Sequence, residues 1–424
     1  MIKTFTRRRL LSSVGGVAAL TLAGCATVAR PRARVVVIGG GFGGATAAKY
    51  IRLWAPEIEV VLVERDAAFV SCPLSNLVLG GSKNIEDLTT GYDTLSKKYG
   101  VRVVRDEALH IDAEKREVRL ARGDTLYYDR LIVSPGVHFQ YDQVPGLSSP
   151  EAQARVLHAW KAGPQTVALR QQLEAMPDGG VYALHIPLAP FKCPPGPYER
   201  AAQVAFYFKH HKPRAKVLVL DANPEIVSKK ALFLKAWAER YPGLIDYRAN
   251  SELVHVDAAQ NMLELQFETV RAEVLNVIPP QQAGKIAQTA GLITANQKWC
   301  GVNFLTFESL VAPCIHVLGD ATLSAPTMPK SGFIANNHAK VAADAVIALL
   351  TGRAVNPEPI LANTCYSFVS DTDAMHVASV HKYDRAQKTL VPVAGAGGLS
   401  PHASAQEGQY AQAWARNIWA DTLL

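Results

Sequence analysis

The chain has 424 residues, of which 49% are hydrophobic and 19% are charged, so it can bury two or three domain cores and is neither disordered nor of low complexity. The formal net charge of +7 falls to +3 without Lys3, Arg7, Arg8 and Arg9 near the N-terminus. A charge this weak and scattered argues against nucleic acid as a partner.

The first predicted element is an export signal over residues 1–30. Arg7–Arg9 precede a short apolar run to Gly24, which is the pattern of a signal peptide, and paired arginines resemble a twin-arginine signal for export to the periplasm. The run is shorter than the ~20 residues that a membrane-spanning helix needs. Leu22–Cys25 also fits a lipoprotein cleavage box, so Cys25 is either lipidated or removed and is left out of the chemistry.

A dinucleotide-binding fingerprint follows. A strand pattern over 34–38 runs through glycines into a helical pattern, and a second strand pattern over 59–63 stops at an acid 20 residues after the last glycine. Such glycines let the backbone approach a pyrophosphate at a helix N-terminus, and the acid accepts the ribose hydroxyls. The residues predicted to bind the dinucleotide here are Gly39, Gly41, Gly44 and Glu64.

Two later segments complete a predicted FAD-binding domain over 31–150 and 278–350. Residues 128–136, which end in Gly136, resemble the strand and turn that close the FAD domain of flavoproteins with two dinucleotide-binding domains. Residues 314–320 resemble the later FAD motif, in which an aspartate hydrogen-bonds the ribityl chain. Gly319 and Asp320 occupy the matching positions, and Cys314 is interpreted as a packing residue at the start of a strand.

The region 151–277 keeps a βαβ pattern without a phosphate-binding loop. Strands are expected at 180–186 and 216–220 and a helix at 198–210, but five prolines occupy the loop 186–199. Proline has no N–H to offer a phosphate and a fixed backbone angle. We therefore expect a degenerate NAD-like domain that binds no NAD(P)H and carries Cys193 in the place of the phosphate-binding loop.

Residues 351–424 form a third predicted piece, which contains Cys365 and a C-terminal aromatic stretch. This stretch is too short for a convincing quinone site and is better explained as a helix packed on the FAD domain or on a partner. The predicted fold class is α/β, with two Rossmann-like nucleotide-binding-type domains, an FAD domain and a degenerate NAD-like domain, plus a C-terminal α+β interface domain.

Five cysteines remain after Cys25, an odd number in a compartment where a disulfide can persist. Cys193 lies where the nicotinamide-side loop of such folds faces the flavin. A disulfide with the distant Cys365 is either structural or an electrophile for a small thiolate-like nucleophile. The residues alone leave both interpretations open.

Several long stretches of the chain resemble a single family. They comprise the glycine loop continuing into 45–50, Cys72 with 74–76, 158–163, 193–200, 278–281, 283–287, 328–332 and 363–367. They are similar to the flavoprotein subunit of flavocytochrome c sulfide dehydrogenase, a relative of sulfide:quinone reductase among the glutathione-reductase-like flavoproteins.

The resemblance implies that Cys72 tethers FAD covalently through the flavin's C8 methyl group, and that Cys193 and Cys365 form a redox disulfide beside the flavin. It further implies oxidation of sulfide to sulfur or polysulfide, with electrons passed to a c-type cytochrome subunit. The chain has no C-x-x-C-H haem-attachment sequence, so the haem is expected on another polypeptide. Cys300 receives no catalytic role, and no metal site is predicted.

Two further residues are candidates for catalysis. Lys330 precedes a helical pattern over 333–350 and is expected, with that helix N-terminus, near the flavin's N1/O2 edge, where positive charge favours the reduced anion; the alternative is a surface lysine. Glu199 either manages protons near Cys193 or is a helix-start carboxylate satisfied by capping. The alternatives for the whole chain are a sulfide:quinone reductase and a non-catalytic flavin-containing protein that docks a cytochrome.

Overall fold

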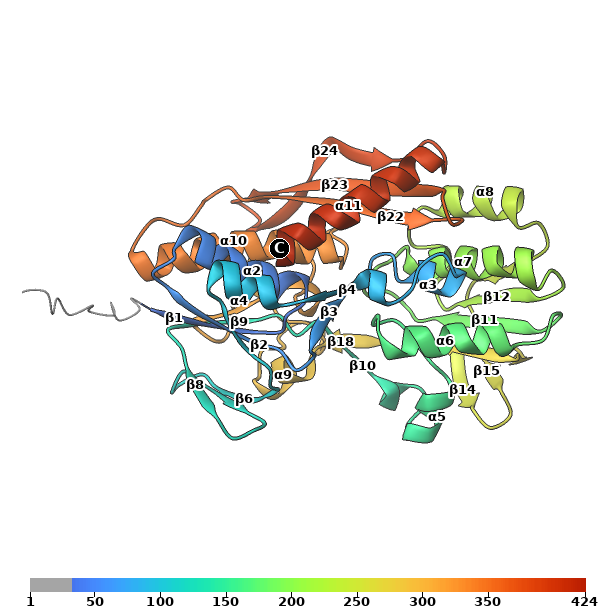
Figure 1. Cartoon of the computed structure of the whole chain (residues 1–424), viewed down its shortest axis with the longest axis horizontal. Helices are drawn as coiled ribbons and strands as arrows, with labels where there is room; N and C mark the ends of the chain where they lie inside the picture. The colour runs from blue at the N-terminus through green and yellow to red at the C-terminus, as the bar shows by residue number, and fades with distance from the viewer. Residues whose placement is uncertain (1–32) are drawn as a thin grey trace, which may run out of the picture. The chain divides into compact units, whose positions relative to one another are not determined.

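The computed structural model describes residues 33–424, which form one unit. The predicted export signal and Cys25 lie outside the described residues. The main parts of the unit are a mostly parallel sheet and a parallel sheet, both with flanking helices, and an antiparallel C-terminal sheet (Figure 1), so the predicted α/β fold class is confirmed.

The first sheet has seven strands in the order β19-β20-β21-β9-β1-β2-β5, and its pairing is parallel from β21 to β5. Its central strands are short runs of Val, Ile and Leu that are buried on both faces, as is typical of a parallel sheet covered by helices. The strands are β1 Arg34–Ile38, β2 Glu59–Val63, β5 Arg102–Val104, β9 Arg130–Val133, β19 Val302–Asn303, β20 Glu308–Ser309 and β21 Ile315–Val317.

Helices α2 (Phe42–Trp54) and α10 (Gly332–Thr351) pack against each other beside this sheet. Both bury small residues where they meet, which lets the two backbones approach closely. The predicted helix over 333–350 is therefore confirmed. The smaller elements around the sheet are β3 Ala68–Val70, α3 Asn76–Gly80, η1 Glu86–Leu88, β4 Thr89–Gly91, α4 Asp93–Tyr99, β6 Ala108–Asp112, β7 Glu117–Leu120, β8 Thr125–Tyr127, β10 Val137–Phe139, η2 Tyr141–Gln143, β18 Gln281–Ala283, α9 Lys285–Thr289 and η3 Gly319–Ala321.

The second sheet is parallel, in the order β13-β12-β11-β17, and α7 (Gly196–His211) connects β11 to β12. The predicted strand, helix and strand are each confirmed to within two residues. The strands and neighbouring elements are α5 Pro150–Arg155, α6 Pro164–Ala175, β11 Val181–Ile186, β12 Lys216–Asp221, α8 Lys230–Arg240, β13 Ile245–Arg248, β14 Leu253–Asp257, β15 Met262–Leu265, β16 Thr269–Arg271 and β17 Val274–Val277.

The C-terminal sheet consists of β22 (Ile360–Phe368), β23 (Ala374–Asp384) and β24 (Thr389–Leu399), and α11 (Ala405–Leu423) follows it. Strand β22 contacts both α10 beside the first sheet and α7 beside the second, and Figure 1 shows the sheet, in orange and red, running along both. The C-terminal sheet can therefore contribute residues to a site between the other two.

Helix α11 packs on α2. This agrees with the expectation that the C-terminal stretch is a helix packed on the FAD domain. The Lys49 ammonium on α2 donates to the carbonyl oxygens of Ala420 (2.8 Å) and Asp421 (3.0 Å), and the Trp419 indole donates to Ser71 Oγ at 2.9 Å. Trp419 thus serves the packing of this helix.

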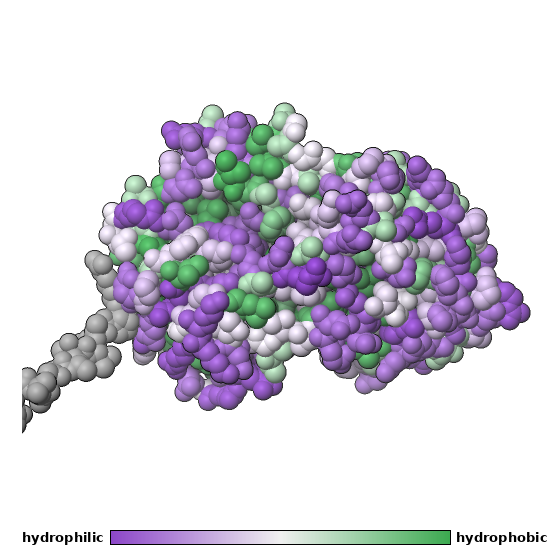
Figure 2. Space-filling view, turned by 45° about the horizontal axis from the view of Figure 1, so that its top comes forward, coloured by the Kyte–Doolittle hydropathy of each residue, from purple (hydrophilic) through white to green (hydrophobic). Residues whose placement is uncertain are grey.

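Within residues 33–424, no helix is long and apolar enough to cross a membrane. On the face shown in Figure 2, hydrophilic residues predominate and hydrophobic ones gather in a few separate areas. Exposed hydrophobic side chains of the C-terminal region include Ile360, Leu399 and Tyr410.

Candidate active site

The loop between β1 and α2 has the geometry of a dinucleotide phosphate site. A Cβ atom added to Gly39, whose φ is +95°, would lie 2.3 Å from the Ser134 carbonyl oxygen, and one added to Gly44 would lie 1.9 Å from the Gly39 carbonyl oxygen. A Cβ on Gly41 would meet no heavy atom within 4 Å. The fold itself requires Gly39 and Gly44, whereas Gly41 leaves space for a ligand.

The N-terminus of α2 supplies donors to that space. The first helical hydrogen bond runs from the Ala45 amide to the Gly41 carbonyl oxygen at 3.0 Å, and within residues 33–424 the amides of residues 42–44 have no hydrogen-bond partner. Free amides and the positive end of the helix dipole bind phosphate oxygens. This loop therefore fits the pyrophosphate of FAD.

Two acids predicted to bind the cofactor lie at the carboxyl ends of strands in the same sheet. Glu64 accepts hydrogen bonds from the amides of Gly40 (2.6 Å) and Asp66 (2.8 Å) and keeps further lone pairs for a ribose. Asp320 is partly exposed, and its carboxylate makes no hydrogen bond or ion pair with any other described residue. Gly136 (φ +64°) and Gly319 (φ +67°) turn the chain after β9 and β21, so the structure brings the predicted FAD-binding residues to one edge of the sheet.

Cys72, between β3 and α3, is partly buried, and its sulfur has two hydrogen-bond donors. The Lys192 ammonium lies 3.2 Å and the Ala162 amide 3.5 Å from Sγ. Burial alone would raise the pKa of Cys72, but Lys192 and Ala162 together outweigh burial and the nearby Asp320 and hold that pKa below its ordinary value. The thiolate, which is the nucleophilic form, is therefore favoured at Cys72.

Cys193 lies in the turn that leads into α7, in a left-handed conformation with φ +55°. Its amide donates to the Lys330 carbonyl oxygen at 2.7 Å, and its own carbonyl accepts from the Gly196 amide at 2.9 Å. The residue is exposed to solvent, yet the surrounding protein raises its pKa by burial, with further contributions from Cys365 and Glu199. Cys193 is therefore accessible to solvent, although its surroundings disfavour the thiolate.

Cys365, on β22, lies beside the N-terminus of α10. The Asn363 side chain is 3.4 Å from its sulfur, and Ser331, the N-cap residue of α10, donates its hydroxyl hydrogen to Asn363 Oδ1 at 2.7 Å. Burial raises the pKa of Cys365, although Lys229, Asn363 and Ser331 oppose this effect.

The structure therefore brings Cys193 and Cys365 into one site, because the consecutive residues Lys330 and Ser331 connect to both. Each cysteine lies near the N-terminus of a long helix, whose dipole opposes the rise in pKa that burial causes at both sulfurs. Both are thiols in this structure, so the predicted disulfide is not formed in it and stays a prediction.

The other two cysteines take no part in this site. Cys300 is fully buried in a β-bridge with Thr322. The Cys314 amide, just before β21, donates to Glu308 Oε1 at 2.7 Å, in keeping with a packing role. Within residues 33–424, no group of three or more His, Cys, Asp or Glu side chains is placed to hold a metal ion.

Glu199 is buried in the first turn of α7 and accepts hydrogen bonds from Asn76 Nδ2 and from the Phe368 amide, each at 2.8 Å. Its partners come from α3 and β22, so the expectation of a carboxylate that caps its own helix is wrong. Burial raises the pKa of Glu199 against the effect of these donors. A carboxyl group with a raised pKa beside Cys193 suits proton transfer.

Lys330 is buried, so the alternative of a surface lysine is wrong. Its ammonium donates to the carbonyl oxygens of Asp320 (3.1 Å) and Thr322 (2.5 Å) and lies 3.7 Å from the centroid of the Trp299 ring. Burial lowers the pKa of Lys330 to about 8. The side chain thus joins the start of α10 to η3, and its predicted effect on a flavin stays a prediction.

Sequence reasoning missed Lys229, which precedes α8 with φ +54°. Its ammonium donates to the Cys365 carbonyl oxygen (3.0 Å), to Ser367 Oγ (2.8 Å) and to the Met375 carbonyl oxygen (3.3 Å). Burial lowers the pKa of Lys229 to about 8, although Cys365 and Glu199 oppose it. No local motif marks this lysine, because its contact with Cys365 spans 136 residues of sequence.

At the end of β12, the position that contacts ribose in a nucleotide-binding βαβ unit is occupied by Asp221. This carboxylate is fully buried and accepts hydrogen bonds from the hydroxyls of Tyr198 (2.7 Å) and Tyr247 (3.0 Å) and from the side-chain amide of Asn223 (2.7 Å). The protein's own side chains therefore fill the place that a ribose would take.

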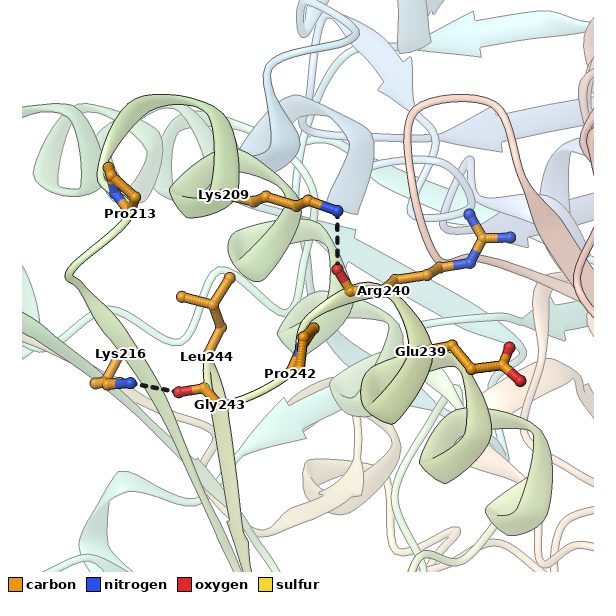
Figure 3. Close-up of a pocket in the computed structure, with 8 residues that line it drawn as sticks. All are labelled: Lys209, Pro213, Lys216, Glu239, Arg240, Pro242, Gly243 and Leu244. Atoms are coloured by element: carbon orange, nitrogen blue, oxygen red, sulfur yellow. Dashed lines mark hydrogen bonds between the residues drawn. The ribbon is translucent and has the colours of Figure 1, made fainter.

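A surface pocket of about 390 Å³ lies at the opposite end of α7 from Cys193 (Figure 3). Two of its lysines are tied back to the protein, Lys209 to the Arg240 carbonyl and Lys216 to the Gly243 carbonyl. Because Lys209 follows Gly196 by 13 residues on one helix, about 20 Å separates this pocket from the thiols. None of the predicted site residues lines it.

Three family models match the chain. Residues 33–174 match "Pyridine nucleotide-disulphide oxidoreductase", residues 166–279 match "Sulfide dehydrogenase (flavocytochrome c) flavoprotein chain, central", and residues 357–423 match "Flavocytochrome c sulphide dehydrogenase, flavin-binding". Between them the matches include Cys72, Cys193 and Cys365, and residues 280–356 lie outside them.

Individual relatives agree with these models. The chain is 64% identical over 45 residues to the sulfide dehydrogenase (flavocytochrome c) flavoprotein chain of Chlorobaculum thiosulfatiphilum, covering 94% of that relative and 11% of this chain. It is 24% identical over 346 residues to the mitochondrial sulfide:quinone oxidoreductase of Mus musculus, covering 77% of this chain and 73% of the relative. The solved sulfide:quinone oxidoreductase of Aquifex aeolicus has the same fold, with a TM-score of 0.72 at 19% identity over 92% of this chain and 91% of that one.

Proposed function

This chain belongs to the flavoprotein chains of flavocytochrome c sulfide dehydrogenase, and we propose that it uses FAD to oxidise sulfide to sulfur or polysulfide and passes the electrons to a c-type cytochrome subunit. The observation that carries this proposal is the meeting of Cys193 and Cys365 at the N-termini of two helices, within one site that also holds Cys72 and Asp320. A cysteine pair near a flavin site can, in its disulfide form, take two electrons from a thiolate-like donor.

The chemistry begins from the oxidised pair. Hydrosulfide attacks one sulfur of a Cys193–Cys365 disulfide, which forms a persulfide on that cysteine and releases the other as a thiolate. A second hydrosulfide attacks the outer sulfur of the persulfide, and the hydrodisulfide anion HSS⁻ leaves. Both cysteines are then thiols, so the pair has received two electrons in total. Glu199 holds or returns a proton at the Cys193 sulfur during these steps.

The residues present fit FAD. Gly41 and the free amides of α2 would hold its pyrophosphate, Glu64 its ribose and Asp320 its ribityl chain, while Cys72 would tether the flavin covalently. FAD, when bound, takes two electrons from a reduced thiol pair and releases them one at a time. Since the sequence holds no C-x-x-C-H motif, we place the haem that receives them on a separate subunit.

We propose that no NAD(P)H takes part. The prolines of the β11–α7 loop offer no N–H groups to a phosphate, and Asp221 is occupied by Tyr198, Tyr247 and Asn223. Addition of NADH to the purified protein should therefore leave the flavin oxidised.

We also propose export to the periplasm by the twin-arginine route, on the strength of the sequence of residues 1–30 alone. Replacement of Arg7 and Arg8 by lysine should leave the protein in the cytoplasmic fraction of the producing cells. Unchanged export of this variant would contradict the twin-arginine route.

Anaerobic titration with sulfide tests the enzyme function. Sulfide should bleach the visible flavin absorbance of the purified full-length protein, and the reduced protein should then reduce a c-type cytochrome. A flavin that sulfide leaves oxidised would instead support a non-catalytic flavin-containing protein that docks a cytochrome.

A sulfide:quinone reductase is the second candidate, because relatives with that name match over long stretches of the chain. Against it, α11 is occupied in packing on α2. The same sulfide-reduced protein distinguishes the two functions, since faster oxidation by a short-chain quinone than by cytochrome c would favour the quinone reductase.

A further inference from the structure

We infer that Lys192 holds the Cys72 sulfur in its thiolate form, ready to bond FAD. This role rests on the proposed function, which makes Cys72 the tether for FAD. Two donors point at the sulfur, Lys192 Nζ at 3.2 Å and the Ala162 amide at 3.5 Å. Among the described residues the sulfur donates to no acceptor, and a sulfur that only accepts hydrogen bonds is in the environment of a thiolate.

The main chain of Lys192 is fixed on both sides, so its ammonium approaches Cys72 from a defined position. The Lys192 amide donates to Gln281 Oε1 at 3.0 Å, and its carbonyl accepts from the Trp160 indole at 3.2 Å. Both bonds come from outside the loop that carries Lys192. The loop that in relatives of this fold binds a nicotinamide phosphate thus delivers a cation to the tether sulfur.

Four charged or titratable groups face the Cys72 sulfur: Lys192, Asp320, Cys193 and Arg200. Burial disfavours the Lys192 ammonium, but Cys72 and Asp320 outweigh it and raise the pKa of Lys192 above its ordinary value. Lys192 is therefore charged throughout the neutral range. Without that charge, burial would dominate at Cys72 and its sulfur would be a thiol.

In the attachment of flavin to Cys72, the protein supplies the thiolate. One C–S bond forms and one C–H bond breaks at the 8-methyl carbon of the flavin, and the proton leaves to solvent. The two electrons stay on the flavin as its two-electron-reduced form. Return to the oxidised form uses the one-electron haem acceptor of the proposed function.

The test compares Lys192→Met with Lys192→Arg and with Lys161→Met, a control on an exposed lysine near Cys72 whose ammonium pairs with Asp66. Full-length proteins are produced under riboflavin limitation, so that part of each preparation carries no flavin. Mass spectrometry of digests gives the fraction of Cys72 peptide that carries flavin. Iodoacetamide labelling of the flavin-free fraction over a series of pH values gives the reactivity of Cys72.

In Lys192→Met we expect about tenfold slower labelling of Cys72 near neutral pH, recovering in alkali, with a matching loss of attached flavin. Lys192→Arg should keep most of both, and Lys161→Met should match the wild type. A labelling profile of Lys192→Met that equals the wild-type profile would overturn the inference. If Lys192→Met does not fold, Lys192→Arg decides instead. Its side chain stays charged at higher pH, so labelling of Cys72 should remain as fast near neutral pH as in the wild type, and clearly slower labelling would overturn the inference.

The two proposals fail in different ways. If the wild-type Cys72 peptide carries no flavin at any time, covalent attachment in the proposed function is wrong, and the labelling profiles still decide whether Lys192 maintains the thiolate. If flavin is attached in the wild type and equally in Lys192→Met, attachment stands and the inference about Lys192 fails.

Discussion

The two cysteines proposed to react with sulfide have different surroundings. Cys193 is open to solvent in a turn, whereas the sulfur of Cys365 has the Asn363 side chain as its neighbour, and the Lys229 ammonium binds the Cys365 main chain. The residues alone left a disulfide between them open as structural or redox-active, and its redox role was predicted from family resemblance. Lys229 could not be predicted, because its role comes from a contact between the second sheet's loop and β22 that no periodicity encodes.

Replacement of either thiol by serine should abolish reduction of the flavin by sulfide. Serine cannot form a disulfide, so Cys193→Ser and Cys365→Ser should each slow flavin bleaching by more than about a hundredfold in stopped-flow absorbance under anaerobic sulfide. Cys314→Ser is the matched control, because Cys314 lies at a strand start away from the site. Normal bleaching in either of the first two variants would exclude the thiol pair as the entry site.

Lys229→Met should reveal the cost of burying this ammonium. The pKa of Lys229 is lowered to about 8 by burial, so between about 8 and its ordinary value near 10.5 the unfolded chain binds more protons and this lysine's contribution to stability rises with pH. Between neutral pH and pH about 9, the free energy of unfolding of the wild type, measured in urea, should therefore rise relative to that of Lys229→Met. A wild-type free energy of unfolding that falls relative to that of Lys229→Met over this range would contradict a lowered pKa.

In the loop that leads into α2, the fold requires Gly39 and Gly44, whereas Gly41 leaves space for a ligand. The fingerprint predicted this strand, loop and helix well, because β-branched runs and glycines act locally. It did not show which glycines are required by the fold, since this depends on the carbonyl groups of Ser134 and Gly39 that lie against them. Glu199 illustrates the same limit, because its hydrogen-bond donors come from α3 and β22.

Gly41→Val and Gly44→Ala should therefore fail in different ways. Valine at 41 projects into open space, so the protein should fold with unchanged far-UV circular dichroism but retain less than about a tenth of its FAD. Alanine at 44 would press on the Gly39 carbonyl oxygen, so this variant should lose soluble, folded protein. FAD content per folded protein is the deciding measurement, and full FAD loading of Gly41→Val would show that the pyrophosphate does not lie at this loop.

Across the whole molecule, Asp421 joins the last helix to two helices of the first sheet. Its carboxylate accepts from Tyr50 OH (2.5 Å) and Asn336 Nδ2 (2.7 Å) and pairs with Lys340 at 2.8 Å. The sequence predicted a helix here that packs on the FAD domain or on a partner, but the hydrogen bonds from Asn336 and Tyr50 that fix it span 85 and 371 residues of sequence. Such long-range contacts, like those of β22 with α7 and α10, are beyond what local patterns can predict.

Asp421→Asn should weaken this junction by about 1–3 kcal/mol in urea unfolding at neutral pH. Burial would raise the pKa of Asp421, but Lys340, Tyr50 and Asn336 hold it below its ordinary value. The carboxylate therefore contributes stability above the pKa of the unfolded chain and loses it as pH falls through the folded pKa. The gap between wild type and variant should close in acid, and a gap that widens there would be inconsistent with a charged Asp421 in the folded protein.

The hydrogen bonds to Asp221 affect whether nucleotide binding could be introduced into the second sheet by substitution. Restoring glycines to the β11–α7 loop would recover only a phosphate site, because the acid that should meet a ribose stays bound to Tyr198 and Tyr247. Removing a single tyrosine leaves the buried carboxylate short of a donor at a cost of about 1–3 kcal/mol before any nucleotide can compensate. A ribose could therefore reach Asp221 only after the loss of hydrogen bonds that the folded protein uses.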